Sequence, residues 1–232
     1  PLPAGACWPR QRLGAGVHAP VTPVRLTVFL CLAFISIVVG MFVYSVVRTP
    51  VLSDEELREQ GVFILPRPRE IAEVDLTDQS GRPFTVETLK GRWSFIFFGF
   101  TNCPDICPTA MSVLGQAERQ IQAEDPEAAA GFQGILVTVD PERDDLKTLG
   151  AYVQAFSPRF MGVGGERDAI AAFATQVNVA FARVPGDGDG YQVDHTANIV
   201  IVNPRGHYHG FAKMPHQADT IVAAYRSLAA RF

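Results

Sequence analysis

Residues 93–108 read WSFIFFGFTNCPDICP, a run that turns from a strand into a helix. The first eight of these residues are almost all apolar or aromatic, which is typical of a strand buried on both faces. Residues 108–123 then repeat apolar positions at helical spacing, and residues 135–139 return as a second apolar strand. A strand, a helix and a strand in this order predict a parallel crossover.

The segments on either side extend this unit into a larger sheet. A first hairpin is expected from residues 71–76 and 84–89, and a closing hairpin from residues 196–203 and 208–212. Further elements are expected as helices at 144–156, 166–178 and 218–232, a short strand at 160–163, and an exposed loop at 186–190. Together they predict an α/β fold whose mixed central sheet is parallel at its centre, antiparallel at its edge and covered by helices on both faces.

Residues 26–47 form a separate apolar segment without any charge or proline. As a helix the segment would span roughly 33 Å, enough to cross the hydrocarbon core of a bilayer. It is too long for the apolar core of a cleavable signal peptide and lacks a small-residue cleavage site. We therefore expect a single transmembrane anchor that contacts lipid; a buried globular helix is the alternative.

The flanking charges predict the orientation of this anchor. Arg10, Arg12 and Arg25 precede it, whereas four acids follow within residues 54–59. The positive-inside rule then makes residues 1–25 a cytoplasmic tail and places the rest across the membrane. We expect a bacterial inner membrane with the domain in the periplasm. The alternative is the mitochondrial inner membrane facing the intermembrane space, although prolines in the leader would break a presequence helix.

The translocated part divides into a linker and a domain. Ser53 and Glu56 form a capping-box pattern that predicts a short helix over residues 54–60, ended by Gly61. We expect this helix to lie in a linker over residues 48–68, followed by one domain over residues 69–232.

The composition excludes several classes of function. The formal net charge is -4 and the sequence has no block of Lys and Arg, so nucleic-acid binding is not expected. Four cysteines are too few for a disulfide scaffold in a chain of 232 residues. Cys7 in the tail and Cys31 in the apolar segment are interpreted as bystanders. The remaining two cysteines are expected to carry local chemistry.

Cys103 and Cys107 lie where the buried strand turns into the helix. The positive end of a helix dipole favours the thiolate form, which attacks disulfides and binds soft metals. A spacing of four residues places both sulfurs on one helix face, about 40° apart. The pair can therefore hold one ion or form a disulfide. Two structural thiols, and a zinc site completed by His207 and His209, are the alternatives.

His195 is the candidate for a third ligand because it follows Asp194 at the end of a predicted strand. Two thiolates and one imidazole make a soft, low-coordinate site suited to Cu(I) and able to hold Cu(II). A loop histidine without a metal remains the alternative. His18 and His216 have no comparable setting.

Four runs resemble the Sco (SenC) family of membrane-anchored copper chaperones: TNCPDICPTAMS at 101–112, VTVDPERDD at 137–145, YVQAFSP at 152–158 and YQVDHTANIVIVNPRG at 191–206. The similarity extends from residue 65 to the C-terminus. It implies a thioredoxin-like fold and one copper per chain, held by Cys103, Cys107 and His195. It also implies delivery of copper to the copper A centre of cytochrome c oxidase, or reduction of the cysteines of that centre.

The partners implied by this resemblance are the oxidase subunit that carries the copper A centre, and other periplasmic copper carriers or thiol reductants. A membrane-anchored thiol-disulfide oxidoreductase, with Cys103 and Cys107 as its redox pair, is the enzyme alternative. The three-residue gap between these cysteines differs from the C-x-x-C of thioredoxins. A redox or copper sensor is a third hypothesis. Asp140 could orient a ligand, but we expect Asp140 and Arg143 to stabilise local structure instead.

Overall fold

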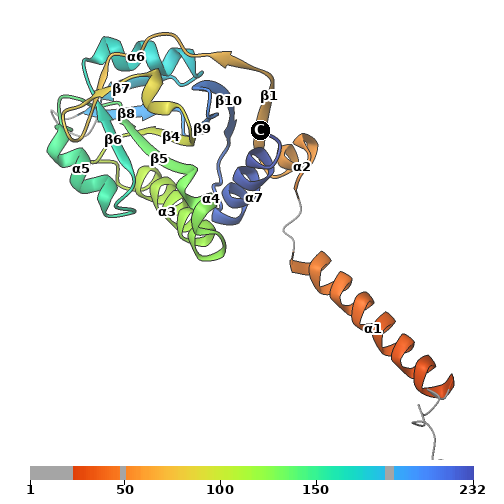
Figure 1. Ribbon diagram of the computed structural model, residues 1–232. Coiled ribbons are helices and arrows are strands. Elements are labelled where there is room, and N and C mark those ends of the chain that lie inside the picture. The colour runs from red at the N-terminus through yellow and green to blue at the C-terminus, as the bar shows by residue number, and fades with distance from the viewer. Residues whose placement is uncertain (1–22, 48–50, 186–190) are drawn as a thin grey trace, which may run out of the picture. The chain divides into compact units, whose positions relative to one another are not determined.

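The computed structural model describes residues 23–47, 51–185 and 191–232 (Figure 1). The chain divides into two compact units, Pro1–Thr49 and Pro50–Phe232. The predicted loop at 186–190 and most of the predicted tail, with Cys7, His18, Arg10 and Arg12, lie outside the described residues.

The first unit contains one described helix, α1, over Pro23–Val47. Its segment Val24–Phe42 is long and apolar enough to cross a membrane, judged by length and composition alone, and its residues are exposed. A helix that is apolar on every face and unburied agrees with the predicted anchor.

The second unit is built on an eight-stranded sheet in the order β1-β10-β9-β4-β5-β6-β2-β3 among the described residues. The strands are β1 Val62–Glu70, β2 Leu76–Asp78, β3 Pro83–Phe84, β4 Trp93–Gly99, β5 Phe132–Thr138, β6 Met161–Gly164, β9 Ile199–Val202 and β10 His207–Ala212. β4, β5 and β6 are parallel, and the outer strands pair antiparallel. The predicted mixed sheet is confirmed, and the fold is thioredoxin-like.

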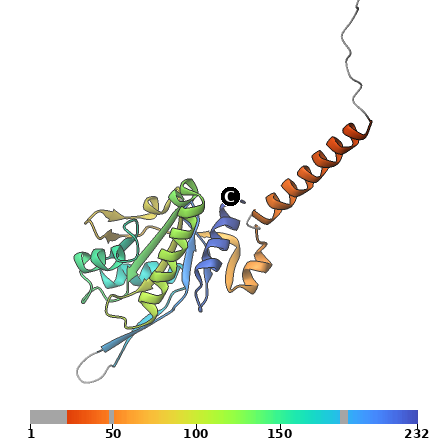
Figure 2. The ribbon, with the colours of Figure 1, turned by 90° about the horizontal axis from the view of Figure 1, so that it is seen from below.

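Helices cover both faces of this sheet (Figures 1 and 2). They are α2 Asp54–Glu59, α3 Ile106–Glu124, α4 Pro126–Ala130, α5 Leu146–Gln154, α6 Arg167–Gln176 and α7 Ala218–Ala229. Side chains alternate between the two faces along β4. On one face, Phe95 packs on Tyr225 of α7 with ring centroids 6.5 Å apart. Phe98 points to the other face and packs on Phe173 of α6 at 5.4 Å. Every residue of β4 is therefore buried, as the sequence predicts.

The predicted linker over residues 48–68 is wrong in its second half. The short helix α2 is present, with the Ser53 and Glu56 capping box formed. Residues 62–70, however, form β1, which pairs antiparallel with β10 at the edge of the sheet. Pro66 and Pro68 fall where the register shifts between Ile64 and Arg69. Prolines are tolerated at such an edge irregularity because no ladder bond is lost.

The predicted hairpins differ from the structure in two places. The first hairpin is shorter than expected, since only β2 and β3 pair, and Val86–Leu89 forms a 3-10 helix. A further antiparallel pair, β7 Phe181–Pro185 and β8 Tyr191–His195, was not predicted as a hairpin. β7 is mostly exposed and so has no apolar alternation to reveal it. Figure 2 shows this pair extending away from the main sheet.

Candidate metal centre

Cys103 and Cys107 are free cysteines at the junction of β4 and α3. Cys103 lies in the turn and is partly buried, whereas Cys107 is the second residue of α3 and is fully buried. The backbone N–H of Cys107 donates to the sulfur of Cys103 at 3.5 Å. The predicted juxtaposition of the two sulfurs at the carboxyl end of a central strand is confirmed.

Gly99, the last residue of β4, makes room for this arrangement. A Cβ atom at position 99 would lie 2.9 Å from Sγ of Cys107 and 3.0 Å from the ring of Phe97. Both contacts are too short for a side chain in a close-packed interior. Glycine at position 99 therefore allows the sulfur of Cys107 to rest against the strand.

His195, the last residue of β8, completes the group. Its Nε2 atom lies 3.5 Å from Sγ of Cys107, and the ligand atoms of Cys103, Cys107 and His195 all lie within 4.8 Å of one another. This is the one group of three or more potential metal-ligating side chains among the described residues.

The surroundings of His195 favour a neutral imidazole that presents Nε2 to the sulfurs. Nδ1 lies 3.2 Å from the carbonyl oxygen of Thr196, and a bond donated by Nδ1–H assigns the lone pair to Nε2. Burial lowers the pKa of His195. The rings of Phe97 and Phe100 meet the imidazole edge-on, at 5.7 and 5.9 Å.

The expectation that the helix N-terminus favours the thiolate form is not met at Cys107. Burial raises the pKa of Cys107 strongly, and its bond with Cys103 and the negative charge of Asp144 raise it further. A bond from the backbone of Phe100 acts in the opposite direction but is outweighed. Without a metal, Cys107 is therefore a neutral thiol.

Asp144 ties the cysteine turn to β5, a role that the sequence did not reveal. Its buried carboxylate accepts bonds from the backbone N–H of Thr101 at 3.0 Å, from the hydroxyl of Thr101 at 2.5 Å and from the hydroxyl of Thr138 at 2.7 Å. These three bonds hold the start of the turn that presents Cys103.

Asp140 connects the loop after β5 to β8. Its fully buried carboxylate accepts a bond from Arg143 and another from the hydroxyl of Tyr191 at 2.7 Å. The guanidinium groups of Arg143 and Arg183 lie 4.1 and 4.3 Å from the centroid of the Tyr191 ring. The expected local bond is present, but Asp140 also anchors the strand that ends in His195.

The alternative of a zinc site completed by His207 and His209 is not supported. The ring of His209 packs on Trp93 with centroids 4.9 Å apart. Trp93 is the first residue of β4, at the opposite end from the cysteine turn. His209 also faces the Asn203 side chain at 3.2 Å.

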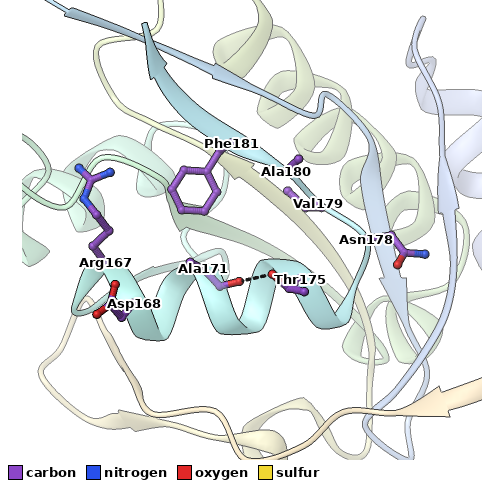
Figure 3. A pocket seen from close by; sticks show the side chains of 8 residues that line it. All are labelled: Arg167, Asp168, Ala171, Thr175, Asn178, Val179, Ala180 and Phe181. Carbon is purple, nitrogen blue, oxygen red and sulfur yellow. Dashed lines mark hydrogen bonds between the residues drawn. The ribbon is translucent and has the colours of Figure 1, made fainter.

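Two hollows lie on this side of the domain, and only the smaller one is lined by a residue of the group. One of about 310 Å³ is lined by residues 180–182 and 194–196, so it opens directly on His195. The other, about 690 Å³, lies between α6 and the start of β7 (Figure 3). They share Ala180 and Phe181. None of the eight residues that line the larger hollow is a candidate ligand, and its Arg167 is held by Glu142 at 2.7 Å.

Two thiols and an imidazole at the carboxyl end of a central strand define a thioredoxin-like protein with a candidate soft-metal site. Residues 66–230 match the SCO1/SenC family. The chain belongs to this family.

Individual relatives agree with this assignment. The mouse protein SCO2 homolog, mitochondrial, is 37% identical over 158 residues, which cover 68% of this chain and 61% of the mouse protein. The chain thus matches less than two thirds of that relative's length. Yeast Sco1 with copper bound has a TM-score of 0.64 and 28% identity over 71% of this chain and 91% of the yeast one. ScoI of Bradyrhizobium japonicum with copper bound has a TM-score of 0.60 and 31% identity, over 68% of this chain and 98% of the ScoI chain.

Proposed function

We propose that this chain is a copper metallochaperone for cytochrome c oxidase, with Cys103, Cys107 and His195 as the ligands of one copper ion per chain. The observation that carries the proposal is the gathering of these three ligand atoms within 4.8 Å. Two sulfurs and one nitrogen are a low-coordinate, soft donor set, which suits Cu(I). The two copper-bound relatives, yeast Sco1 and ScoI of Bradyrhizobium japonicum, support this choice of metal.

Copper is the cargo in this proposal, and the chain's own residues prepare the site. Thr196 orients the imidazole of His195, and the Phe97 and Phe100 rings limit the access of water. Bound copper would hold both thiols as thiolates, and the protons of the thiols would leave on loading. The acceptor, the oxidase subunit with the copper A centre, would approach over the hollow that opens on His195.

The same site supports a second role, reduction of the cysteines of the copper A centre. Cys103 is the more accessible of the two thiols and would attack first, and Cys107 would then close the intramolecular disulfide. A redox or copper sensor would use the same residues. Other periplasmic copper carriers or thiol reductants would load or reduce the site.

We further propose that residues 26–47 anchor the protein in the membrane, with residues 1–25 in the cytoplasm and the unit Pro50–Phe232 as the copper-binding domain. A bacterial inner membrane is favoured over the mitochondrial one because the prolines within residues 1–25 would break the amphipathic helix that a mitochondrial presequence needs.

Complementation of a deletion strain tests the proposed function. Wild-type chain should restore the copper A centre, whereas H195A, C103S and C107S should not. If H195A restores the copper A centre as well as wild type does, the thiol-disulfide role is correct and the carrier role is wrong. Transcription that changes while oxidase assembly stays intact would identify a sensor.

A further inference from the structure

The ribbon of β7 and β8 has an unpaired edge. β7 pairs with β8 on one side and with no other strand among the described residues. The backbone N–H of Thr196 donates to the carbonyl oxygen of Ala180 at 2.9 Å, so these two residues form a hydrogen-bonded pair that continues the ladder. Because such pairs alternate along an antiparallel ribbon, the backbone N–H and C=O groups of Phe181 and Arg183 point away from β8. An edge of this kind can be extended by a strand of another chain.

The hollow of about 690 Å³ adjoins this edge. One wall is a face of α6 that includes Ala171 and Thr175, and the other is formed by residues 178–181, which lead into β7 (Figure 3). None of the eight residues that line the hollow belongs to β8, so the hollow lies on the side of β7 that faces away from β8. The hydroxyl of Thr175 donates to the carbonyl oxygen of Ala171 at 2.8 Å, which leaves this wall small and without a free donor. A groove between a helix and a strand edge suits an extended peptide.

Phe181 connects this edge to the metal centre. It stands directly opposite His195 in the ladder of the ribbon. Their pair is one without shared backbone hydrogen bonds, the kind in which side chains lie closest. Phe181 also lines both hollows, and the smaller hollow opens on His195. A strand added to β7 would therefore lie two strand spacings, roughly 10 Å, from the strand that carries His195.

We propose that the free edge of β7 binds an extended segment of the copper acceptor protein, which pairs with Phe181 and Arg183 and lies against α6. This inference rests on the proposed function. Unpaired backbone groups select another polypeptide backbone, and the acceptor is the protein that must come within reach of His195. A second copy of this chain fits the groove less well, because its matching edge is bordered by its own α6 and the two helices would meet in the groove.

The test measures binding and copper transfer between the full chain, kept in detergent, and the reduced, metal-free copper A domain of the oxidase subunit. A171R places a long side chain in the hollow. A172R is the matched control, because it adds the same side chain at the next position of α6, which is exposed and does not line the hollow. Thermal unfolding checks that both variants fold, and Cu(I) competition checks that both keep the metal centre. Amide hydrogen exchange of wild type, resolved to single residues, reports on the backbone of β7 directly.

A171R should bind the acceptor domain about tenfold or more weakly than wild type, because the added side chain occupies the space of the bound segment. A172R should bind as wild type does. In the wild-type complex, the amide protons of Phe181 and Arg183 should exchange about tenfold or more slowly than in the free chain, because each then donates a hydrogen bond.

Two results would overturn the inference alone, with copper transfer by wild type still supporting the proposed function. One is equal binding by A171R and A172R, and the other is exchange at Phe181 and Arg183 that the acceptor domain does not slow. A wild-type dimer that A171R dissociates would identify a second copy as the occupant and would also overturn the inference. If wild-type chain transfers no copper to the domain, the proposed function is wrong, and the inference falls with it.

Discussion

The sulfur of Cys107 lies 3.5 Å from Nε2 of His195, although 88 positions separate the two residues in the sequence. Cys107 comes from the first turn of α3, and His195 from a two-stranded ribbon outside the main sheet. A metal bound between them would join two elements that share no ladder of backbone hydrogen bonds. The distance between the two ligands therefore depends on the side chains that hold α3 and β8 in place.

Copper affinity should rise with pH. Burial raises the pKa of Cys107, so copper must displace the proton of this thiol, whereas burial lowers the pKa of His195, which is already neutral near pH 7. Each proton released strengthens the apparent affinity about tenfold per pH unit. Competition titrations at pH 6, 7 and 8 should therefore show at least this slope. A flat profile would contradict the assignment of Cys107 as a neutral thiol.

The metal-free protein should lose stability as the pH falls below about 6.5. Burial lowers the pKa values of His195, His209 and His216. The unfolded chain takes up protons at these histidines near pH 6.5, while the folded chain resists until its own lower pKa values are reached, so the free energy of unfolding decreases with falling pH. Urea unfolding between pH 7 and pH 5 measures this slope. In H209Q one histidine fewer takes up a proton on unfolding, so the free energy of unfolding should change less with pH than in wild type. The same pH dependence in H209Q and wild type would contradict the prediction.

Replacing Gly99 should disturb both packing and binding. In G99A the added methyl group would lie 2.9 Å from the sulfur of Cys107. Overpacking of this kind costs about 1–3 kcal/mol, and relief by a shift of Cys107 would weaken copper binding. G164A is the matched control, because its methyl group would meet its nearest neighbour, a side-chain atom of Leu149, at 3.3 Å. Wild-type copper affinity in G99A would show that Gly99 does not position the sulfur.

Neutralising Asp140 should loosen β8 and thereby weaken copper binding. D140N replaces the buried carboxylate that Arg143 and Tyr191 share, and we expect a loss of about 1–3 kcal/mol of stability. E142Q changes a more exposed neighbour that pairs with Arg167 and Arg183, and should cost less than about 1 kcal/mol. Urea unfolding and Cu(I) titration of both variants check this. If D140N is destabilised but binds Cu(I) with wild-type affinity, Asp140 does not position His195 for copper binding.

The part of the site that is local in sequence could be predicted, and the part built by tertiary packing could not. Cys103 and Cys107 follow a recognisable strand-to-helix turn, so their spacing alone predicts a shared face. His195 needed the family resemblance, because spacing does not reveal which strand end approaches the turn. Asp144 is brought to the cysteine turn by the loop before α5, and no local pattern marks it.

The fold was predictable where burial leaves a pattern. The apolar run of β4 predicts a central strand correctly, since both of its faces are covered. Pro66 and Pro68 argue against a strand over residues 62–68, and only the pairing of β1 with β10 makes these prolines acceptable at the edge of the sheet. Similarly, the sequence shows a helix N-terminus at Cys107 but not the depth at which its sulfur is buried, and this burial raises the pKa of the thiol.

One measurement tests the central claim most directly: an anaerobic Cu(I) competition titration of the reduced unit Pro50–Phe232, beside its H195A variant. This unit is compact and contains the whole sheet and all three candidate ligands. We predict one tightly held copper per chain in wild type and markedly weaker binding in H195A, while both proteins still form the disulfide between Cys103 and Cys107. Weak binding that is the same with and without His195 would contradict the carrier function and leave a dithiol reductase in its place.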